Sequence, residues 1–174
     1  MREERESSSR RAALVFNPTK ATADQVRAAA VRLSAEAGWE PPLLLETTID
    51  DPGQGVTAAA LAAGVSAVMV AGGDGTVRAV AEAMRGSGVP LTIVPSGTGN
   101  LLARNLGLPL DNPERMITAT FSGTTTSIDI GIADVERSDG TRSEHAFVVM
   151  AGIGMDAAMI ANTRPKLKKQ IGWM

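Results

Sequence analysis

The stretch Val68-Met69-Val70-Ala71-Gly72-Gly73-Asp74-Gly75-Thr76-Val77 decides the fold. Its first half is an uninterrupted apolar run, which is typical of a strand buried on both faces of a parallel sheet. The run ends at three glycines around one aspartate, and helical spacing begins at Thr76. A strand that leads through a glycine turn into a helix presents backbone N–H groups to a phosphate. The stretch therefore predicts an α/β domain with a phosphate-binding turn.

Apolar runs and turn signals alternate on both sides of this stretch. The patterns predict strands at 12–16, 43–45, 66–71 and 91–94, and helices at 22–37, 57–63, 76–85, 101–106 and 113–123. A capping box at Thr22 and Gln25, and Asn112 before Pro113, mark two of the helix starts. Strands alternating with helices through short connections predict βαβ units and a parallel sheet. The predicted fold class is therefore α/β, with a parallel-sheet, Rossmann-like nucleotide-binding domain.

The pattern changes after Gly123. Segments 125–133 and 146–150 are expected to form a β-hairpin around a polar turn at 136–140, and a further helix is expected from about Met155. We therefore expect a disordered leader at 1–11, an α/β nucleotide-binding domain at 12–124 and the incomplete beginning of a second, β-rich domain at 125–174. The chain is expected to be the N-terminal part of a longer protein. An open hairpin edge is expected to be disordered or to pair with a second copy of the chain.

Composition excludes several classes of function. The 174 residues include no cysteine and one histidine, His145, which excludes disulfides, thiolate catalysis and zinc sites built from Cys or His. A formal charge of −2 argues against a nucleic-acid-binding protein. Residues 1–10 alternate charges and serines, so they resemble neither a signal peptide nor a transmembrane helix. We expect a cytoplasmic protein that has no nucleic-acid partner.

A second glycine loop, Pro95-Ser96-Gly97-Thr98-Gly99-Asn100, follows the strand at 91–94. Asn17-Pro18 and Thr47-Thr48 also follow strands, and ligands bind at the edge where the carboxyl ends of parallel strands meet. We predict that the two glycine loops hold a polyphosphate between them. The first loop lacks the P-loop lysine and the G-x-G-x-x-G spacing. The alternative is a pair of routine turns in which Asp74, Thr76 or Asn100 caps a helix.

These motifs resemble the diacylglycerol kinase catalytic domain family. The resemblance rests on Gly72–Thr76, on Gly97–Asn100 with the following 101–109, and on Asn17-Pro18; segments 128–131 and 152–157 fit the entry into the family's second domain. The family includes bacterial diacylglycerol kinases and sphingosine-type lipid kinases, and NAD kinase is a fold relative. The resemblance implies transfer of the γ-phosphoryl group of ATP to a lipid hydroxyl, such as that of diacylglycerol, with Mg²⁺ as cofactor. It also implies that 125–174 begins the lipid or acceptor domain.

The resemblance also assigns site residues. Asp74 would orient Mg²⁺–ATP or the attacking hydroxyl and is the expected catalytic residue, while the metal ligands stay open. The nucleotide would be bound by Asn17, Thr48, Gly72, Gly73, Gly75, Thr76, Gly97, Thr98 and Asn100. A lipid acceptor implies transient contact with a membrane surface, so the protein would be cytoplasmic with a peripheral membrane association. The candidates for that contact, which also fit a solvated helix face, are Arg164, Lys166, Lys168 and Lys169.

The chain departs from the family pattern in three places. Asn17-Pro18 continues without the usual glycine, although Lys20 supplies a positive charge nearby. Arg78 and Ala79 stand where many members have Asn-Glu, which removes a carboxylate, and most of the second domain would lie beyond Met174. Two alternatives therefore stay open. One is an enzyme of NAD kinase or sphingoid-base kinase type with a different acceptor, and the other is a nucleotide-binding module without catalysis.

Overall fold

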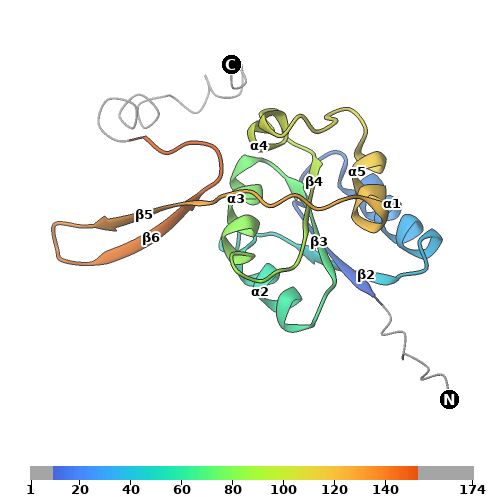
Figure 1. The fold of residues 1–174 in the computed structure, drawn as a ribbon, viewed down its shortest axis with the longest axis horizontal. Helices are drawn as coiled ribbons and strands as arrows, with labels where there is room; N and C mark the ends of the chain where they lie inside the picture. Colours follow the sequence, from blue (N-terminus) through green and yellow to red (C-terminus); the bar gives the residue numbers. More distant parts are fainter. Residues whose placement is uncertain (1–9, 153–174) are drawn as a thin grey trace.

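The structure, a computed structural model, describes residues 10–152 and is built around a four-stranded parallel sheet (Figure 1). Its strands are β1 (Arg11–Phe16), β2 (Glu40–Glu46), β3 (Ala67–Gly72) and β4 (Leu91–Pro95). The strand order is β2-β1-β3-β4. The chain moves from β1 outward to β2 and then returns to the other side of β1, so the order reverses between β1 and β3. Open α/β sheets bind ligands at such a switch point. The predicted α/β class is confirmed.

Helices cover both faces of the sheet (Figure 1). On one face, α1 and α5 pack on strand residues such as Leu14 and Met69. On the other face, α2, α3 and α4 pack on the alternate residues, such as Val15 and Val70. All six residues of β3 are buried, as its unbroken apolar sequence predicts. The helices are α1 (Ala23–Glu36), α2 (Gln54–Ala62), α3 (Asp74–Ala83), α4 (Leu101–Asn105) and α5 (Pro113–Ser122).

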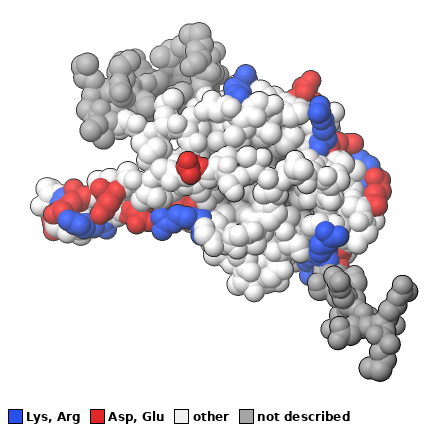
Figure 2. All heavy atoms as spheres, viewed as in Figure 1, with Lys and Arg blue, Asp and Glu red and all other residues white. Residues whose placement is uncertain are grey.

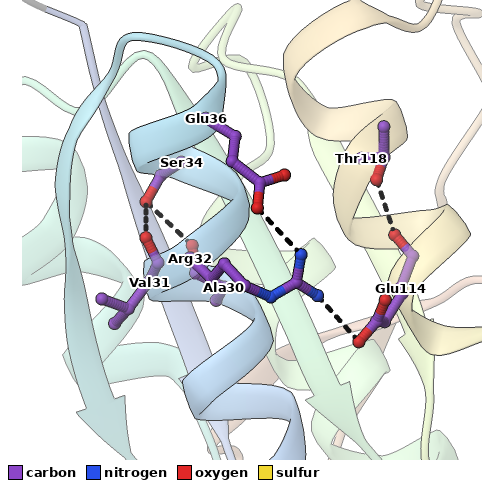
Figure 3. Close-up of polar contacts among 7 residues, drawn as sticks. All are labelled: Ala30, Val31, Arg32, Ser34, Glu36, Glu114 and Thr118. Atoms are coloured by element: carbon purple, nitrogen blue, oxygen red, sulfur yellow. Dashed lines mark hydrogen bonds and ion pairs between the residues drawn. The ribbon is translucent and has the colours of Figure 1, made fainter.

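Polar contacts join α1 to α5 at the surface of the first face (Figure 3). Arg32 contacts Glu36 on its own helix at 3.0 Å and Glu114 on α5 at 2.9 Å. Hydrogen bonds to these two carboxylates raise the pKa of Arg32. The buried Ser34 hydroxyl donates to the carbonyl of Ala30 at 2.8 Å, so it has a partner inside the helix. The interface between these helices thus combines a buried aliphatic layer with an exposed ionic bridge.

A β-hairpin projects from the α/β body (Figure 1). It consists of the antiparallel strands β5 (Gly131–Glu136) and β6 (Arg142–Phe147). Figure 2 shows acidic and basic side chains along the hairpin, whereas the central part of this face of the body carries few charges. Arg142 lies 2.7 Å from Glu136 and 3.6 Å from Asp134. The hairpin is therefore a largely polar ribbon in which ion pairs between the two strands add to the backbone pairing.

The predicted β-hairpin is present, but the predicted bounds of its strands, 125–133 and 146–150, are wrong. The pattern search followed apolar residues, whereas the observed strands pair polar side chains around a turn closed by the Arg137 N–H donating to the Thr141 carbonyl at 2.8 Å. The capping box is also wrong, because the Thr22 side chain makes no capping hydrogen bond. The cap at Asn112 is confirmed, since its side chain accepts from the N–H of Arg115 at 2.9 Å.

Several element boundaries differ from the predicted ones. Strand β2 is longer and includes Pro41 and Pro42, which an edge strand tolerates because one side of it needs no ladder partner. Helix α2 begins at Gln54, three residues earlier than predicted, and α3 begins at Asp74, two residues earlier. Within residues 10–152, no helix combines the length and the apolar character that crossing a membrane requires. The first nine residues, the predicted helix from Met155 and the basic residues 164–169 lie outside the described residues.

Candidate functional site

The glycine turn after β3 is the first turn of α3. Gly73 is the N-cap residue, with φ −81° and ψ 178°, and its carbonyl accepts the first helical hydrogen bond from Val77 at 3.0 Å. The N–H groups of the first helical residues have no acceptor within their own helix and lie at its positive end. A Cβ atom added at Gly73 or Gly75 would meet nothing within 4 Å. Gly75 is also exposed, so other side chains do not cover the outer side of this first turn.

Gly72 has a packing role instead. A Cβ atom there would lie 2.6 Å from the Cβ of Thr76, whose side chain is buried against the end of β3. Only glycine leaves room for the Thr76 side chain at this point. Thr76 therefore anchors the turn through its side chain, while its backbone N–H belongs to the open first turn of α3.

The loop after β4 packs directly on this turn. A Cβ atom added at Gly97 would lie 3.1 Å from the Cα of Gly73. Asn100 adopts the left-handed conformation, with φ 49° and ψ 43°. Its side chain accepts from the N–H of Gly97 at 3.1 Å and donates to the Gly97 carbonyl at 2.8 Å. Asn100 thus shapes the loop and does not cap α4 with its side chain, while Thr98 is exposed between the glycines.

Asp74 links the two loops. Its Oδ1 accepts a hydrogen bond of 2.6 Å from the N–H of Leu101, the first residue of α4. Its Oδ2 lies against Gly99, where a Cβ atom would collide with it. Arg104 completes the connection by donating from Nε to the Gly99 carbonyl at 2.8 Å. The expected catalytic aspartate is therefore also a structural residue that caps a helix 27 positions along the chain.

Asn17 lies on the other side of the switch point, at the end of β1. Its N–H donates to the carbonyl of Ala71 at 3.1 Å, so it stands beside the last residues of β3. Its side-chain Oδ1 accepts from the N–H and the hydroxyl of Thr19 at 2.9 and 2.8 Å. Within residues 10–152 the Asn17 Nδ2 group and the Lys20 ammonium make no hydrogen bond or ion pair. These donors remain available at the sheet edge.

Thr48 follows β2, one strand further from the glycine loops. Its hydroxyl accepts from the N–H of Asp51 at 2.9 Å, and its own N–H donates to the Asp51 carbonyl at 2.9 Å. The Thr48 side chain is therefore used in a local turn, although the residue is exposed at the same edge. The structure brings Asn17 and the two glycine loops together, and leaves Thr48 at the margin of this group.

Asp51 is a residue that the sequence analysis missed. Its carboxylate accepts from the N–H groups of Gly53, Gly55 and Val56 at 3.0, 3.0 and 2.9 Å and so holds the start of α2. Burial raises the pKa of Asp51, but these three donors outweigh it and leave the pKa below its usual value. An aspartate just before a helix is a recognisable capping signal. The signal was missed because the glycines that follow Asp51 were assigned to a loop, and the helix was predicted to begin later.

Comparison with known proteins identifies the family. The sequence profile described as the diacylglycerol kinase catalytic domain matches residues 11–133. The chain belongs to this family. The family match covers the four-stranded sheet, the five helices within residues 10–152 and both glycine loops, so the two glycine motifs that suggested the resemblance lie inside it.

Individual family members support the assignment. A protein named "Diacylglycerol kinase" from Mycobacterium tuberculosis is 41% identical over 100 residues, which cover 58% of this chain and 31% of that protein. A protein from Pseudomonas aeruginosa named "Probable lipid kinase YegS-like" is 37% identical over 162 residues, which cover 91% of this chain and 49% of the relative. The matched part of the chain thus spans about half or less of the length of these relatives.

The fold is shared with a solved structure. A diacylglycerol kinase from Bacillus anthracis superposes with a TM-score of 0.54 at 23% sequence identity. The superposition covers 79% of this chain and 50% of the other. This likeness concerns the fold alone.

Proposed function

We propose that this chain is the nucleotide-binding part of an ATP-dependent lipid kinase, which transfers the γ-phosphoryl group of ATP to a lipid hydroxyl such as that of diacylglycerol. One observation carries the proposal. The loop after β4 packs against the first turn of α3, where Gly97 approaches Gly73 and Asp74 accepts from Leu101. Two backbone loops held together beside the switch point form a cradle suited to the phosphates of a nucleotide.

The residues at the cradle fit a bound ATP. The open space above Gly73 and Gly75 allows phosphate oxygens to approach the first N–H groups of α3. Asn17 Nδ2 and Lys20 would add side-chain donors from the end of β1, and Thr98 would add a hydroxyl from the facing loop. Thr48 would lie at the outer margin of the nucleotide. Phosphoryl transfer depends chiefly on positioning and charge neutralisation, which such donors supply.

Mg²⁺ also fits this site in the way that the ion is usually held in kinases. Magnesium takes one or two carboxylates together with substrate phosphates and retains several waters. Asp74 is the carboxylate that lies in the cradle, with Oδ1 on Leu101 and Oδ2 beside Gly99. Within residues 10–152 no group of three acidic or histidine side chains forms a metal cage. Asp74 would orient either the metal-bound nucleotide or the attacking hydroxyl, and Mg²⁺ would neutralise phosphate charge.

Further proposals concern the acceptor, the place where the chain would act and its pairing with a second chain. A lipid acceptor requires transient contact with a membrane surface, and the chain would act there as a peripheral, cytoplasmic protein. A different acceptor, a sphingoid base or NAD, is the alternative within the same fold. Pairing of two chains through the hairpin edge is a further proposal, since β5 is an edge strand in this structure, whereas the outer edge of β6 is contacted by α3.

A specific observation favours a nucleotide-binding module without catalysis as the second candidate. Ala79 is fully buried and carries no carboxylate, and the neighbouring Arg78 is bound to Glu82 and to the Ala146 carbonyl. Neither residue replaces the acidic side chain that many family members carry at this point. The two candidates differ in whether transfer occurs after ATP has bound.

The two candidates are separated by measuring binding and transfer on the same preparation. Calorimetry with ATP and Mg²⁺ reports binding, and transfer of labelled phosphate to diacylglycerol in mixed micelles reports catalysis. The kinase proposal expects ATP binding by this chain, and transfer either by this chain or by a longer form that includes the acceptor domain, with transfer abolished by Asp74→Asn. Binding without transfer to diacylglycerol, a sphingoid base or NAD by either form supports the module. Failure of ATP to bind at millimolar concentration contradicts both.

A further inference from the structure

Helix α3 contacts the hairpin through a pair of side chains that the proposed nucleotide site does not use. Ala146, near the end of β6, is 3% exposed. Its N–H donates to Glu82 Oε1 at 3.2 Å, and its carbonyl accepts from Arg78 Nη1 at 3.4 Å. Arg78 and Glu82 are also paired with each other at 3.0 Å. One ion pair of the helix therefore satisfies both backbone groups of a single strand residue.

The orientation of Ala146 explains why this contact is needed. Ala146 stands opposite Ile132 of β5, yet its N–H and carbonyl both face α3. Such a residue belongs to a non-hydrogen-bonded pair of an antiparallel ladder, so its polar groups lie on the outer edge of the ribbon. A buried backbone group without a partner is costly. The Arg78–Glu82 pair takes the place of a neighbouring strand at this position.

Further contacts hold the pair and the strand in place. Gln54 of α2 donates from Nε2 to Glu82 Oε2 at 3.1 Å, which fixes the carboxylate between two helices and the strand. One turn further along, Arg85 lies 2.7 Å from Glu144 of β6. Val148 and Val149, just after β6, pack against the core cluster that contains α3. The base of the hairpin is therefore fixed to the body, although most of its residues are exposed.

We propose that Arg78 and Glu82 form a latch that positions the β-hairpin relative to the glycine loops at the start of α3. The same helix carries both features, with Asp74 at its first position and the latch one to two turns later. A rigid helix transmits the placement directly. In the proposed kinase, on which this inference rests only for its functional consequence, Arg78 and Glu82 would be positioning residues that act through the hairpin.

The charge state of Glu82 agrees with its hydrogen bond to Ala146. Burial raises the pKa of Glu82, but the Ala146 N–H, the Gln54 amide and the Arg78 guanidinium outweigh it and lower the pKa below its usual value. The carboxylate is therefore ionised when it accepts from Ala146. The guanidinium of Arg78 reaches from α3 to the Ala146 carbonyl of the strand.

Hydrogen–deuterium exchange of this chain tests whether Arg78 and Glu82 hold the hairpin. In Glu82→Ala, the amides of 142–149 are expected to exchange about tenfold faster or more, since a charge-assisted hydrogen bond to a buried N–H is lost. Exchange in β3 should stay unchanged and shows that the α/β body is folded. Glu36→Ala is a matched control, because Arg32–Glu36 is an exposed pair of the same spacing and the same 3.0 Å distance on α1. This control should leave the hairpin unchanged.

A conservative variant separates positioning from general destabilisation. Glu82→Gln keeps an amide oxygen for Ala146, so it should restore part of the protection lost in Glu82→Ala. Arg78→Ala should also speed exchange, and the double variant should fall short of the summed effects because both side chains serve Ala146. Unchanged exchange at 142–149 in Glu82→Ala, or no rescue by Glu82→Gln, overturns the proposal.

A second measurement keeps this inference distinct from the proposed function. ATP affinity, measured by calorimetry, should be the same in the wild type and in Glu82→Ala. A fall of about tenfold would place Glu82 in nucleotide binding and would contradict a positioning role. If the wild-type chain binds no ATP, the proposed function fails, while the exchange result still decides whether the latch exists.

Discussion

Strands β3 and β6 both lie against α3 but are stabilised by opposite means. All six residues of β3 are buried, and both of its neighbours in the sheet are strands. Of the six residues of β6, Ala146 alone is buried, one neighbour is a strand, and the other edge is contacted by side chains of a helix. A strand can thus be fixed by burial or by charged hydrogen bonds, and the two cases should respond differently to mutation and pH.

Core truncation should show the largest difference between these regions. Leu14→Ala, in β1 beside β3, is expected to cost about 2–5 kcal/mol of unfolding free energy, because it leaves a cavity in a fully buried layer. Ile132→Ala, in β5 beside β6, should cost less than about 1 kcal/mol because Ile132 is 39% exposed. Urea denaturation followed by circular dichroism measures both. Equal losses of unfolding free energy in the two variants would contradict the contrast between the buried sheet and the exposed hairpin.

The neighbouring glycines of the first loop provide the next test. Gly72→Ala is expected to cost about 1–3 kcal/mol, since the new methyl group meets the buried Thr76 side chain. Gly73→Ala is the matched control, because its extended backbone accepts alanine and its Cβ meets nothing within 4 Å. Thermal denaturation should leave Gly73→Ala near the wild type. A larger loss at Gly73 would show that the packing of the turn is misassigned.

Asp74 allows the structural and catalytic roles to be separated. Asp74→Ala removes the acceptor of the Leu101 N–H and should cost about 1 kcal/mol, as for the loss of a helix cap. Asp74→Asn keeps an oxygen at that position and should stay within about 0.5 kcal/mol of the wild type. Phosphoryl transfer should be lost in both variants. Retained transfer in Asp74→Asn would leave Asp74 with a structural role only.

The local features predicted from sequence were those that depend on neighbouring residues. The buried strand before Gly72, the two glycine loops and the cap at Asn112 follow from composition within a few residues, and the structure contains each of them. The bond from Leu101 to Asp74 joins residues 27 positions apart, so no local pattern contained it. The start of α3 was placed too late because Gly75 was assigned to the turn, although it lies in the helix.

The hairpin was less predictable for a related reason. Its strands carry Asp134, Glu136 and Arg142, which pair with one another across the ribbon. Strands held by such charged pairs do not show the regular alternation of apolar and polar residues that predicts a strand. Its docking depends on Arg78 and Glu82, which lie more than 60 positions away in sequence. Side chains that satisfy a strand edge from a helix have no periodic signature.

A smaller effect is expected from acidification of the latch. The pKa of Glu82 is lower in the folded chain than in the unfolded one, so its contribution is complete above the usual Glu value of about 4.3 and is lost as the pH falls through the folded pKa. Arg78, the Gln54 amide and the Arg85–Glu144 pair are the polar groups near Glu82 at this contact. Protection of the amides of 142–149, corrected for intrinsic exchange, should therefore decrease as the pH is lowered through this range. Glu82→Gln should lack the step.

The smallest effect should come from the ion pairs within the ribbon. Arg142→Ala removes contacts to Asp134 and Glu136, all three of which are exposed. Such pairs contribute about 0–1 kcal/mol and are screened by salt. Denaturation at low and high salt should therefore differ less in Arg142→Ala than in the wild type. A loss comparable with that of Leu14→Ala would contradict the division between the two regions.

The central claim is that the open first turn of α3 binds the phosphates of ATP. Calorimetry of Mg²⁺–ATP with the wild type and with Gly75→Ala tests it most directly, because alanine suits a helix and adds about 0.5 kcal/mol of stability while its methyl group enters the open space. We expect a stably folded variant that binds ATP at least about tenfold more weakly than the wild type. Equal affinity in the two proteins, or no binding by the wild type, would contradict the claim.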